Sequence, residues 1–175
     1  MGLSFLLRML ICSCFTLLYF SGVQALATPI SVFEEQLEKS TSNKRILLVI
    51  DGDSITKFRL ADLEKIPLYE IEMPPIWKEE GGKYQGVLLK DILSSAGVSE
   101  ATSVRLVALD GYLIELPEKK WHGGCAFVAT RYKKQEIPVE DKGPTRLMFP
   151  CMVTDPDYEE TTTSEWIWNL REIHI

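Results

Sequence analysis

The sequence predicts a single β-rich α+β domain, because short strand patterns outnumber helical ones along its 175 residues. Two pairs of apolar runs are separated by turns that contain Asp-Gly, the preferred turn pair of β-hairpins. One segment has the apolar spacing of a helix, and the chain shows no repeat or low-complexity tract. The length that remains after an N-terminal leader suits one domain with one core.

The first 27 residues are expected to be a secretory signal peptide. Arg8 supplies a positive charge, residues 9–20 are almost wholly apolar, and Ala25-Leu26-Ala27 has the small-x-small pattern of a cleavage site. The alternative is a membrane anchor, which the short apolar run disfavours. We therefore expect an exported protein that begins near residue 28.

The N-terminal third is expected to hold an arm, a hairpin and a short helix. Residues 28–44 are polar and acidic, which suits a short helix or a mobile arm before the domain proper at 45–175. The apolar runs 45–50 and 55–60 flank an Asp-Gly-Asp-Ser turn and predict a hairpin. Residues 61–66 have room for one or two helical turns before Pro67.

The middle of the chain contains the clearest predicted helix. Residues 68–84 are expected to be irregular, because Pro74-Pro75 forbids a regular helix and Gly81-Gly82 loosens the end of the segment. Residues 86–96 place five apolar side chains on one face, and Gly97 supplies a C-terminal stop.

Strand patterns dominate the C-terminal half. The runs 104–109 and 112–116 flank Asp110-Gly111 and predict a second hairpin. Three more strands are expected at 126–132, at 147–149 and at 166–175, where the last of them closes the domain.

Charge and residue inventory exclude several classes of function. The formal net charge is −6 with no basic cluster, which argues against binding nucleic acid or an anionic membrane surface. The two histidines, His122 and His174, belong to no hydrolase or metalloprotease motif and show no metal-ligand spacing. We therefore expect neither a hydrolytic site nor a conventional metal site.

Cys125 and Cys151 are the two cysteines outside the leader. In an oxidising compartment, a disulfide between them is one interpretation, and two buried thiols are the other. His122 lies three residues before Cys125, but this spacing on a Gly-Gly loop is no signature of a catalytic thiol.

Residues 141–150 suggest a ligand-binding turn. Lys142 and Arg146 stand four residues apart around Gly143-Pro144, and the segment runs directly into an apolar strand. Such a turn can hold a flat anionic or polar ligand at a sheet edge. Trp77 in a Pro-rich loop is a candidate for stacking on a ring, with a loop anchor as the alternative. Arg131 at a strand end is a further candidate, whereas Trp168 is expected in the core.

Five segments in order resemble one family, the sulfite-oxidase-type molybdopterin-binding domain. The resemblance covers residues 45–175 and is carried by Gly86–Leu93 with Ala96-Gly97-Val98, Ala108–Tyr112 with Leu116-Pro117, Ala129–Tyr132 with Ile137-Pro138, Asp141–Pro150, and Trp168–Ile173. It implies a single-domain sulfite-oxidase-like fold.

The resemblance also implies a cofactor site and shows where this chain departs from it. In enzymes of the family, basic residues at the positions of Arg146 and Lys142 hold the pyranopterin. Their molybdenum-ligating cysteine stands upstream of the Gly-Val-x-Leu helix, in a window that here spans residues 68–85 and contains no cysteine. Because thiolate ligation fixes the metal and its redox chemistry, this chain is not expected to hold molybdenum.

Stand-alone secreted members that lack this cysteine are similar in length. They resemble periplasmic proteins that sense a pterin and act on a membrane-bound cyclic-di-GMP cyclase or phosphodiesterase. The resemblance implies a monomeric, non-enzymatic periplasmic protein that binds a free or reduced pterin. Trp77 or a tyrosine would stack on the ring, and Asp110 or Asp157 would accept hydrogen bonds from its amino-pyrimidine edge.

Two alternatives are left open by the sequence. One is a molybdopterin-dependent periplasmic oxidoreductase with an unexpected metal ligand. The other is a protein-interaction domain on a vestigial cofactor fold, with the acidic segment 155–160 as its contact surface.

Overall fold

A computed structural model describes residues 31–33, 35–75, 81–153 and 164–175. This part of the chain forms two β-sheets with short helices, which confirms the predicted β-rich α+β class. The expected signal peptide lies outside the described residues. Within the described ranges, no helix is both long and apolar enough to cross a membrane.

The first sheet has the strand order β1 (Ser31–Val32), β4 (Tyr69–Met73), β5 (Gly82–Leu88), β8 (Phe127–Tyr132), β10 (Arg146–Met148), and β9 (Gln135–Glu136) also pairs with β8. The second sheet has the order β3 (Ser54–Arg59), β2 (Arg45–Asp51), β11 (Leu170–His174), β6 (Ser103–Ala108), β7 (Leu113–Pro117). The helices are α1 (Leu60–Leu63), α2 (Leu89–Ser95), α3 (Glu118–Trp121) and α4 (Pro150–Val153).

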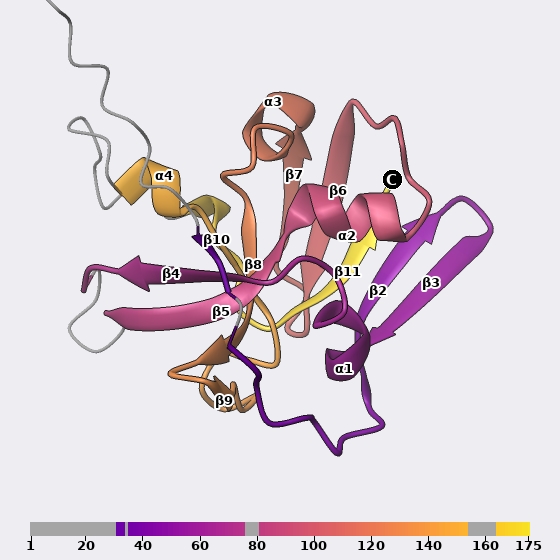
Figure 1. The fold of residues 1–175 in the computed structure, drawn as a ribbon. Helices are drawn as coiled ribbons and strands as arrows, with labels where there is room; N and C mark the ends of the chain where they lie inside the picture. The colour runs from indigo at the N-terminus through magenta and orange to yellow at the C-terminus, as the bar shows by residue number, and fades with distance from the viewer. Residues whose placement is uncertain (1–30, 34, 76–80, 154–163) are drawn as a thin grey trace, which may run out of the picture.

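Both predicted hairpins are confirmed in the second sheet. β2 pairs antiparallel with β3, and β6 pairs antiparallel with β7, each around its Asp-Gly turn. The predicted closing strand is β11, which runs parallel to β2 on one side and antiparallel to β6 on the other. Figure 1 shows this yellow strand between the two hairpins. The C-terminal strand therefore joins two local hairpins into one sheet.

The segment 68–84 was predicted to be irregular, and this prediction is wrong. β4 and β5 occupy most of it and pair antiparallel, with Ile71 opposite Tyr84. The residues of β4 alternate in burial at its C-terminal end, where Ile71 and Met73 are buried and Glu72 is exposed. The Pro-Pro pair follows the end of β4, and the Gly-Gly pair lies at the start of β5. The two pairs therefore mark the connection between two strands and not an irregular segment.

The predicted helix at 86–96 begins later than expected, because Gly86, Val87 and Leu88 extend β5 and α2 starts at Leu89. At Gly86 an added Cβ would lie 2.2 Å from the Val128 carbonyl oxygen of β8. The glycine thus allows two strands to approach closely, a role that a single sequence does not distinguish from a helix start. Gly97 has φ +86 and ends the helix as predicted.

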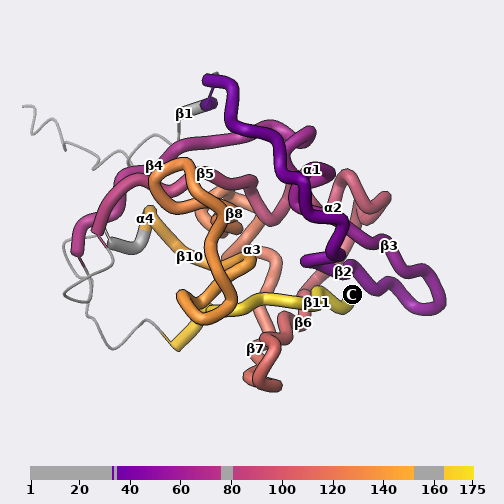
Figure 2. Tube along the Cα trace, turned by 90° about the horizontal axis from the view of Figure 1, so that it is seen from below, coloured from indigo at the N-terminus to yellow at the C-terminus, as the bar shows by residue number. Residues whose placement is uncertain are grey.

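The N-terminal arm contains no helix in its described residues. β1 pairs with β4, and residues 35–44 then continue in irregular conformation to β2. Figure 2 shows this indigo segment passing alongside α1. The arm is therefore tied to the domain by one short strand and by contacts near α1.

The core is one cluster to which both sheets and α2 contribute. Leu47 and Leu106 come from the second sheet, Val87 and Phe127 from the first, and Ile92 from α2, and all five are fully buried. Figure 1 shows α2 in front of the strands β6 and β11.

Of the tryptophans that the structure describes, Trp121 and Trp166 belong to this core. Trp168 was also expected there, but 41% of its surface is exposed. That expectation is wrong, because Trp168 lies in the bend between the Leu147–Ile167 bridge and β11, where its side chain is exposed while Ile167 is buried.

The close approach at Gly86 predicts a large cost for any side chain there. Gly86→Ala should lower the free energy of unfolding by about 3 kcal/mol, because the neighbouring atoms are backbone and must move. Gly123→Ala is the matched control, since an added Cβ there meets nothing within 4 Å, and should change stability by less than about 0.5 kcal/mol. Urea unfolding of both variants measures the difference; equal effects would contradict the close approach.

Candidate ligand site

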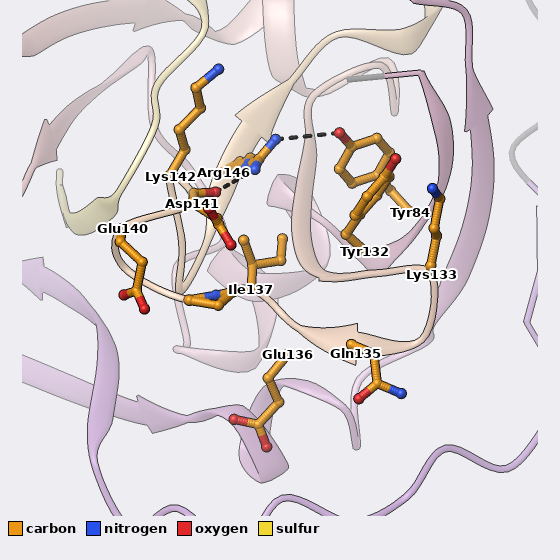
Figure 3. A pocket seen from close by; sticks show the side chains of 11 residues that line it. Tyr84, Tyr132, Lys133, Gln135, Glu136, Ile137, Glu140, Asp141, Lys142 and Arg146 are labelled. Atoms are coloured by element: carbon orange, nitrogen blue, oxygen red, sulfur yellow. Dashed lines mark hydrogen bonds between the residues drawn. The ribbon is translucent and has the colours of Figure 1, made fainter. Parts of the chain in front are cut away.

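A pocket of about 590 Å³ opens where the first sheet meets the loop that precedes β10. Its lining comes from β5, the β8–β9 turn, β9, the loop 137–142 and β10: Tyr84, Tyr132, Lys133, Gln135, Glu136, Ile137, Pro138, Glu140, Asp141, Lys142 and Arg146. Figure 3 shows these side chains, with Arg146, Tyr84 and Tyr132 close to one another. The pocket thus combines aromatic rings with both signs of charge.

Arg146 is the buried cation of this pocket. It begins β10 opposite Ala129 of β8, and only 6% of its surface is exposed. Its Nη1 donates to the Tyr84 hydroxyl at 3.3 Å, and its Nη2 donates to the Asp141 carbonyl oxygen. Burial lowers the pKa of Arg146, while Tyr84 and Asp141 oppose that shift. Because arginine has an ordinary pKa above 12, it stays charged and offers a desolvated cation to the pocket.

Tyr84 and Tyr132 form the aromatic part of the pocket. Their ring centroids are 4.8 Å apart, and the planes are tilted by 38°. Tyr84 is 1% exposed, and burial raises the pKa of its hydroxyl. The Tyr132 hydroxyl donates to the Gly81 carbonyl oxygen at 2.9 Å, which fixes the ring. Held in this way, the half-buried Tyr132 ring packs on the buried Tyr84 ring and provides a preformed aromatic surface for a flat ligand.

The β8–β9 turn holds one rim of the pocket. It is a two-residue hairpin turn in which Lys133 and Lys134 both have positive φ, 49° and 67°. The Lys134 backbone N–H donates to Gln85 Oε1 at 2.8 Å, and Gln85 Nε2 donates to Glu70 at 2.8 Å. A fully buried glutamine therefore supports a turn that lysines adopt at a cost of about 1 kcal/mol each.

Asn169 fixes the opposite wall. Its Nδ2 donates to the Val139 carbonyl oxygen at 2.8 Å and also to that of Gly143. Its backbone N–H donates to the Lys142 carbonyl oxygen at 3.0 Å. Asn169 has φ +50, a conformation that asparagine tolerates well, and it stands directly before β11. The loop 137–143 is thereby attached to the central strand of the second sheet.

Residues with left-handed backbone conformation, that is with positive φ, lie around this pocket. In the part of the chain that the structure describes, the non-glycine residues with positive φ are Lys133, Lys134, Lys142 and Asn169. Two of them line the pocket, and the other two support its rims. Sparsely populated conformations concentrate at functional sites, because the surrounding structure must hold them.

Lys142 was predicted to contact the ligand, and it lines the pocket. Its Nζ lies 4.0 Å from the centroid of the Trp168 ring. Figure 3 shows its side chain extending away from the two tyrosines. The Lys142 ammonium therefore sits on the exposed Trp168, at the edge of the site.

Arg131 was predicted to bind the ligand, and the structure corrects this. It is 3% exposed and does not line the pocket. Its Nε lies 2.5 Å from Glu64 Oε1, and Nη2 donates to the Glu38 carbonyl oxygen at 2.7 Å. Nη1 donates to the Lys134 carbonyl oxygen at 3.2 Å. Arg131 is instead a structural residue that joins α1, the N-terminal arm and the β8–β9 turn.

The other predicted contacts do not meet at this pocket. Asp110 is exposed in the β6–β7 turn, where its Oδ1 accepts the Tyr112 backbone N–H at 2.9 Å. Asp110 does not line this pocket, and its predicted contact with a pterin edge stays a prediction. Trp77 and Asp157 lie outside the described residues. Cys125 and Cys151 are thiols in mutual hydrogen-bond contact, and their predicted disulfide stays a prediction.

Residues 78–155 match the family model described as oxidoreductase molybdopterin binding domain. No curated protein matches the chain. The matched range carries every residue that lines the pocket, including Tyr84 and Arg146. The pocket therefore lies inside the segment that matches this family model.

The donors of the pocket fit the organic part of a molybdopterin better than its metal. Arg146 and Lys142 suit anionic or carbonyl oxygens, and the tyrosines suit a ring system. The lining contains no cysteine. Across the described ranges, no group of three or more histidine, cysteine and carboxylate side chains is arranged to hold a metal ion. The residues thus fit a pterin without fitting a thiolate-held molybdenum.

Tyr84, Tyr132 and Asn169 are important residues that the sequence analysis did not select. In the sequence analysis Tyr132 is only the end of the segment Ala129–Tyr132, and Tyr84 is only the end of the segment predicted to be irregular. A usable signal existed for Asn169, because an asparagine directly before a closing strand is a common site of positive φ. The tyrosines meet through long-range strand pairing, for which the sequence has no local signal.

Removing the Asn169 amide should loosen the pocket wall. Asn169→Gly keeps the positive φ but deletes the Nδ2 hydrogen bonds, and we expect a loss of about 2 kcal/mol in the free energy of unfolding. Asn43→Gly, in the exposed end of the arm, is the matched control and should be close to neutral. Chemical denaturation measures both, and amide exchange should increase at residues 137–143 in the first variant only.

Proposed function

We propose that this protein binds a pterin, free or reduced, in the Arg146 pocket, and that it senses the pterin without catalysing a reaction on it. The observation that carries the proposal is a buried guanidinium beside two packed tyrosines, inside a segment that matches a molybdopterin-binding family. Residues 68–85 contain no cysteine, so we expect the protein to bind a pterin without a molybdenum ion held by a thiolate.

The polarity of the pocket suits both edges of a pterin. The ring carbonyl and ring nitrogens accept hydrogen bonds, which the Arg146 guanidinium is placed to donate. The amino-pyrimidine edge donates hydrogen bonds, and Glu136, Glu140 and Asp141 lie among the lining residues that offer carboxylate acceptors. These three acids line the pocket, whereas Asp110 does not and Asp157 lies outside the described residues.

Burial explains why Arg146 would dominate binding. A hydrogen bond from a charged donor is stronger where water is excluded, and Arg146 has already been desolvated by the fold. Tyr84 and Asp141 hold the guanidinium in place, so little side-chain freedom is lost when a ligand arrives. Lys142, which lies on Trp168, contributes a weaker, more exposed charge.

The proposed role is periplasmic signalling. By its resemblance to the secreted branch, the protein would act on the periplasmic domain of a membrane-bound cyclic-di-GMP cyclase or phosphodiesterase. Two exposed apolar side chains near the pocket support this role, because a partner protein could contact them. Val139, which is 55% exposed, belongs to the loop 137–143 that forms the pocket wall, and Trp168, which is 41% exposed, contacts Lys142 of the same loop. A partner that contacts these side chains would contact the pocket wall.

A molybdopterin-dependent oxidoreductase is the second candidate, because the family match carries that description. It requires a metal ligand other than the cysteine expected before the Gly-Val-Leu segment. Purified full-length protein, produced in a host that makes both free pterins and the molybdenum cofactor, distinguishes the two candidates. We expect mass spectrometry of the released small molecules to find a pterin and elemental analysis to find no stoichiometric molybdenum. Stoichiometric molybdenum would favour the oxidoreductase instead.

Arg146→Ala should weaken binding of a reduced pterin, such as tetrahydrobiopterin, by about tenfold to hundredfold, because it deletes a charge-assisted donor. Isothermal titration calorimetry measures the dissociation constant, and thermal unfolding reports stability. Arg105→Ala on an exposed position of β6 is the matched control and should leave both unchanged.

Arg131→Met provides the opposite contrast. It breaks a buried ion pair with Glu64, so it should lower stability strongly while the folded fraction still binds the pterin. If Arg146→Ala binds as tightly as the unsubstituted protein, or if neither protein binds any reduced pterin, the proposed function is wrong.

A further inference from the structure

Two thiols lie side by side just beyond the paired ends of β8 and β10. In the antiparallel register of these strands, Met148 lies opposite Phe127. Cys125 stands just before β8, and Cys151 stands just after β10, in α4, so the antiparallel pair leaves both cysteines at the same end. The two cysteine side chains are hydrogen-bonded to each other, and both are half-buried. Strand pairing thus brings together two cysteines that are far apart in the sequence.

We propose that Cys125 and Cys151 are a redox-active dithiol, which an oxidant of the disulfide class converts into an intramolecular disulfide that links the start of β8 to α4. This inference is independent of the pterin proposal, because neither cysteine lines the pocket.

Cys151 is the thiol expected to react first. The hydrogen bond from Cys125 lowers the pKa of Cys151 from 9.0 to about 7. Near neutral pH the thiolate fraction is then about fifty times that of a thiol with the unshifted pKa. A thiolate of lower pKa is also a weaker nucleophile, so the net gain in rate is about sixfold. Partial exposure gives a small disulfide access to the sulfur.

The oxidation balances in two exchange steps. The Cys151 thiolate attacks one sulfur of the oxidant disulfide, which forms a mixed disulfide and releases one thiolate. Cys125 then loses its proton and attacks Cys151 Sγ, which forms the Cys125–Cys151 bond and releases the second thiolate. Two electrons pass to the oxidant, which leaves as two thiols after taking up the protons.

The bond would close a loop that holds most of the ligand pocket. Between Cys125 and Cys151 lie the β8–β9 turn, the loop 137–143 and β10, which together carry Lys133, Lys142 and Arg146. A cross-link at the ends of this segment restricts the unfolded chain and should raise the thermal midpoint of the oxidised protein. The dithiol is therefore placed to stabilise the part of the chain that builds the site.

The test uses the full-length protein with Cys12→Ser and Cys14→Ser, in which Cys125 and Cys151 are the remaining thiols. After incubation with glutathione disulfide, we expect the intact mass to fall by two hydrogen atoms and both thiols to disappear. Peptide mapping should recover Cys125 and Cys151 in one cross-linked fragment. Glutathione retained on both cysteines, or no reaction of either, would overturn the proposal.

Two further measurements keep the test independent of any one variant. With Cys125→Ser added, Cys151 should retain one glutathione, because the second step is blocked; rapid loss of that adduct contradicts the assigned order. In the protein without this change, alkylation of Cys151 by iodoacetamide should rise with pH around a midpoint near the pKa of about 7. A midpoint near 9, the ordinary value for a thiol, contradicts the contact between the two cysteines.

Discussion

The close pairing of β5 with β8 is the constraint on which the rest of the structure depends. At Gly86 the two strands approach so closely that a Cβ would meet the Val128 carbonyl oxygen. This pairing places Tyr84 opposite Tyr132, and β10 on the other edge of β8 brings Arg146 beside them. An aromatic cluster and a buried cation therefore arise from three neighbouring strands, and the Asp141 carbonyl oxygen of the loop 137–143 also accepts a hydrogen bond from Arg146.

The outer wall of the pocket belongs to the same rigid body as the core. Thr145 and Leu170 exchange two hydrogen bonds, from the Leu170 N–H to the Thr145 carbonyl oxygen at 2.9 Å and from Thr145 Oγ1 to the Leu170 carbonyl oxygen at 2.6 Å. Together with Asn169, they connect the segment before β10 to β11 of the second sheet. A site built across two sheets in this way is preorganised, so binding need not provide the free energy for ordering a loop.

Two buried arginines, Arg131 of β8 and Arg146 of β10, differ in the groups that they contact and therefore in their expected roles. Arg131 meets a carboxylate and two backbone carbonyls, so its charge is balanced inside the protein. Arg146 meets a neutral hydroxyl and a carbonyl oxygen, and it faces a pocket of about 590 Å³. Burying a cation is expensive, and a buried charge that faces a pocket is a candidate for a functional group.

The sequence by itself determined the local elements: both Asp-Gly hairpins, the end of α2 at Gly97, the strand 126–132 and the turn that leads into β10 at Arg146. These depend on turn chemistry and on apolar spacing, which a few neighbouring residues encode. Tertiary structure alone decided that Gly86 belongs to a strand, that Arg131 is structural and that Trp168 is exposed. Those outcomes depend on partners such as Val128 and Glu64, which lie more than forty residues away in the sequence.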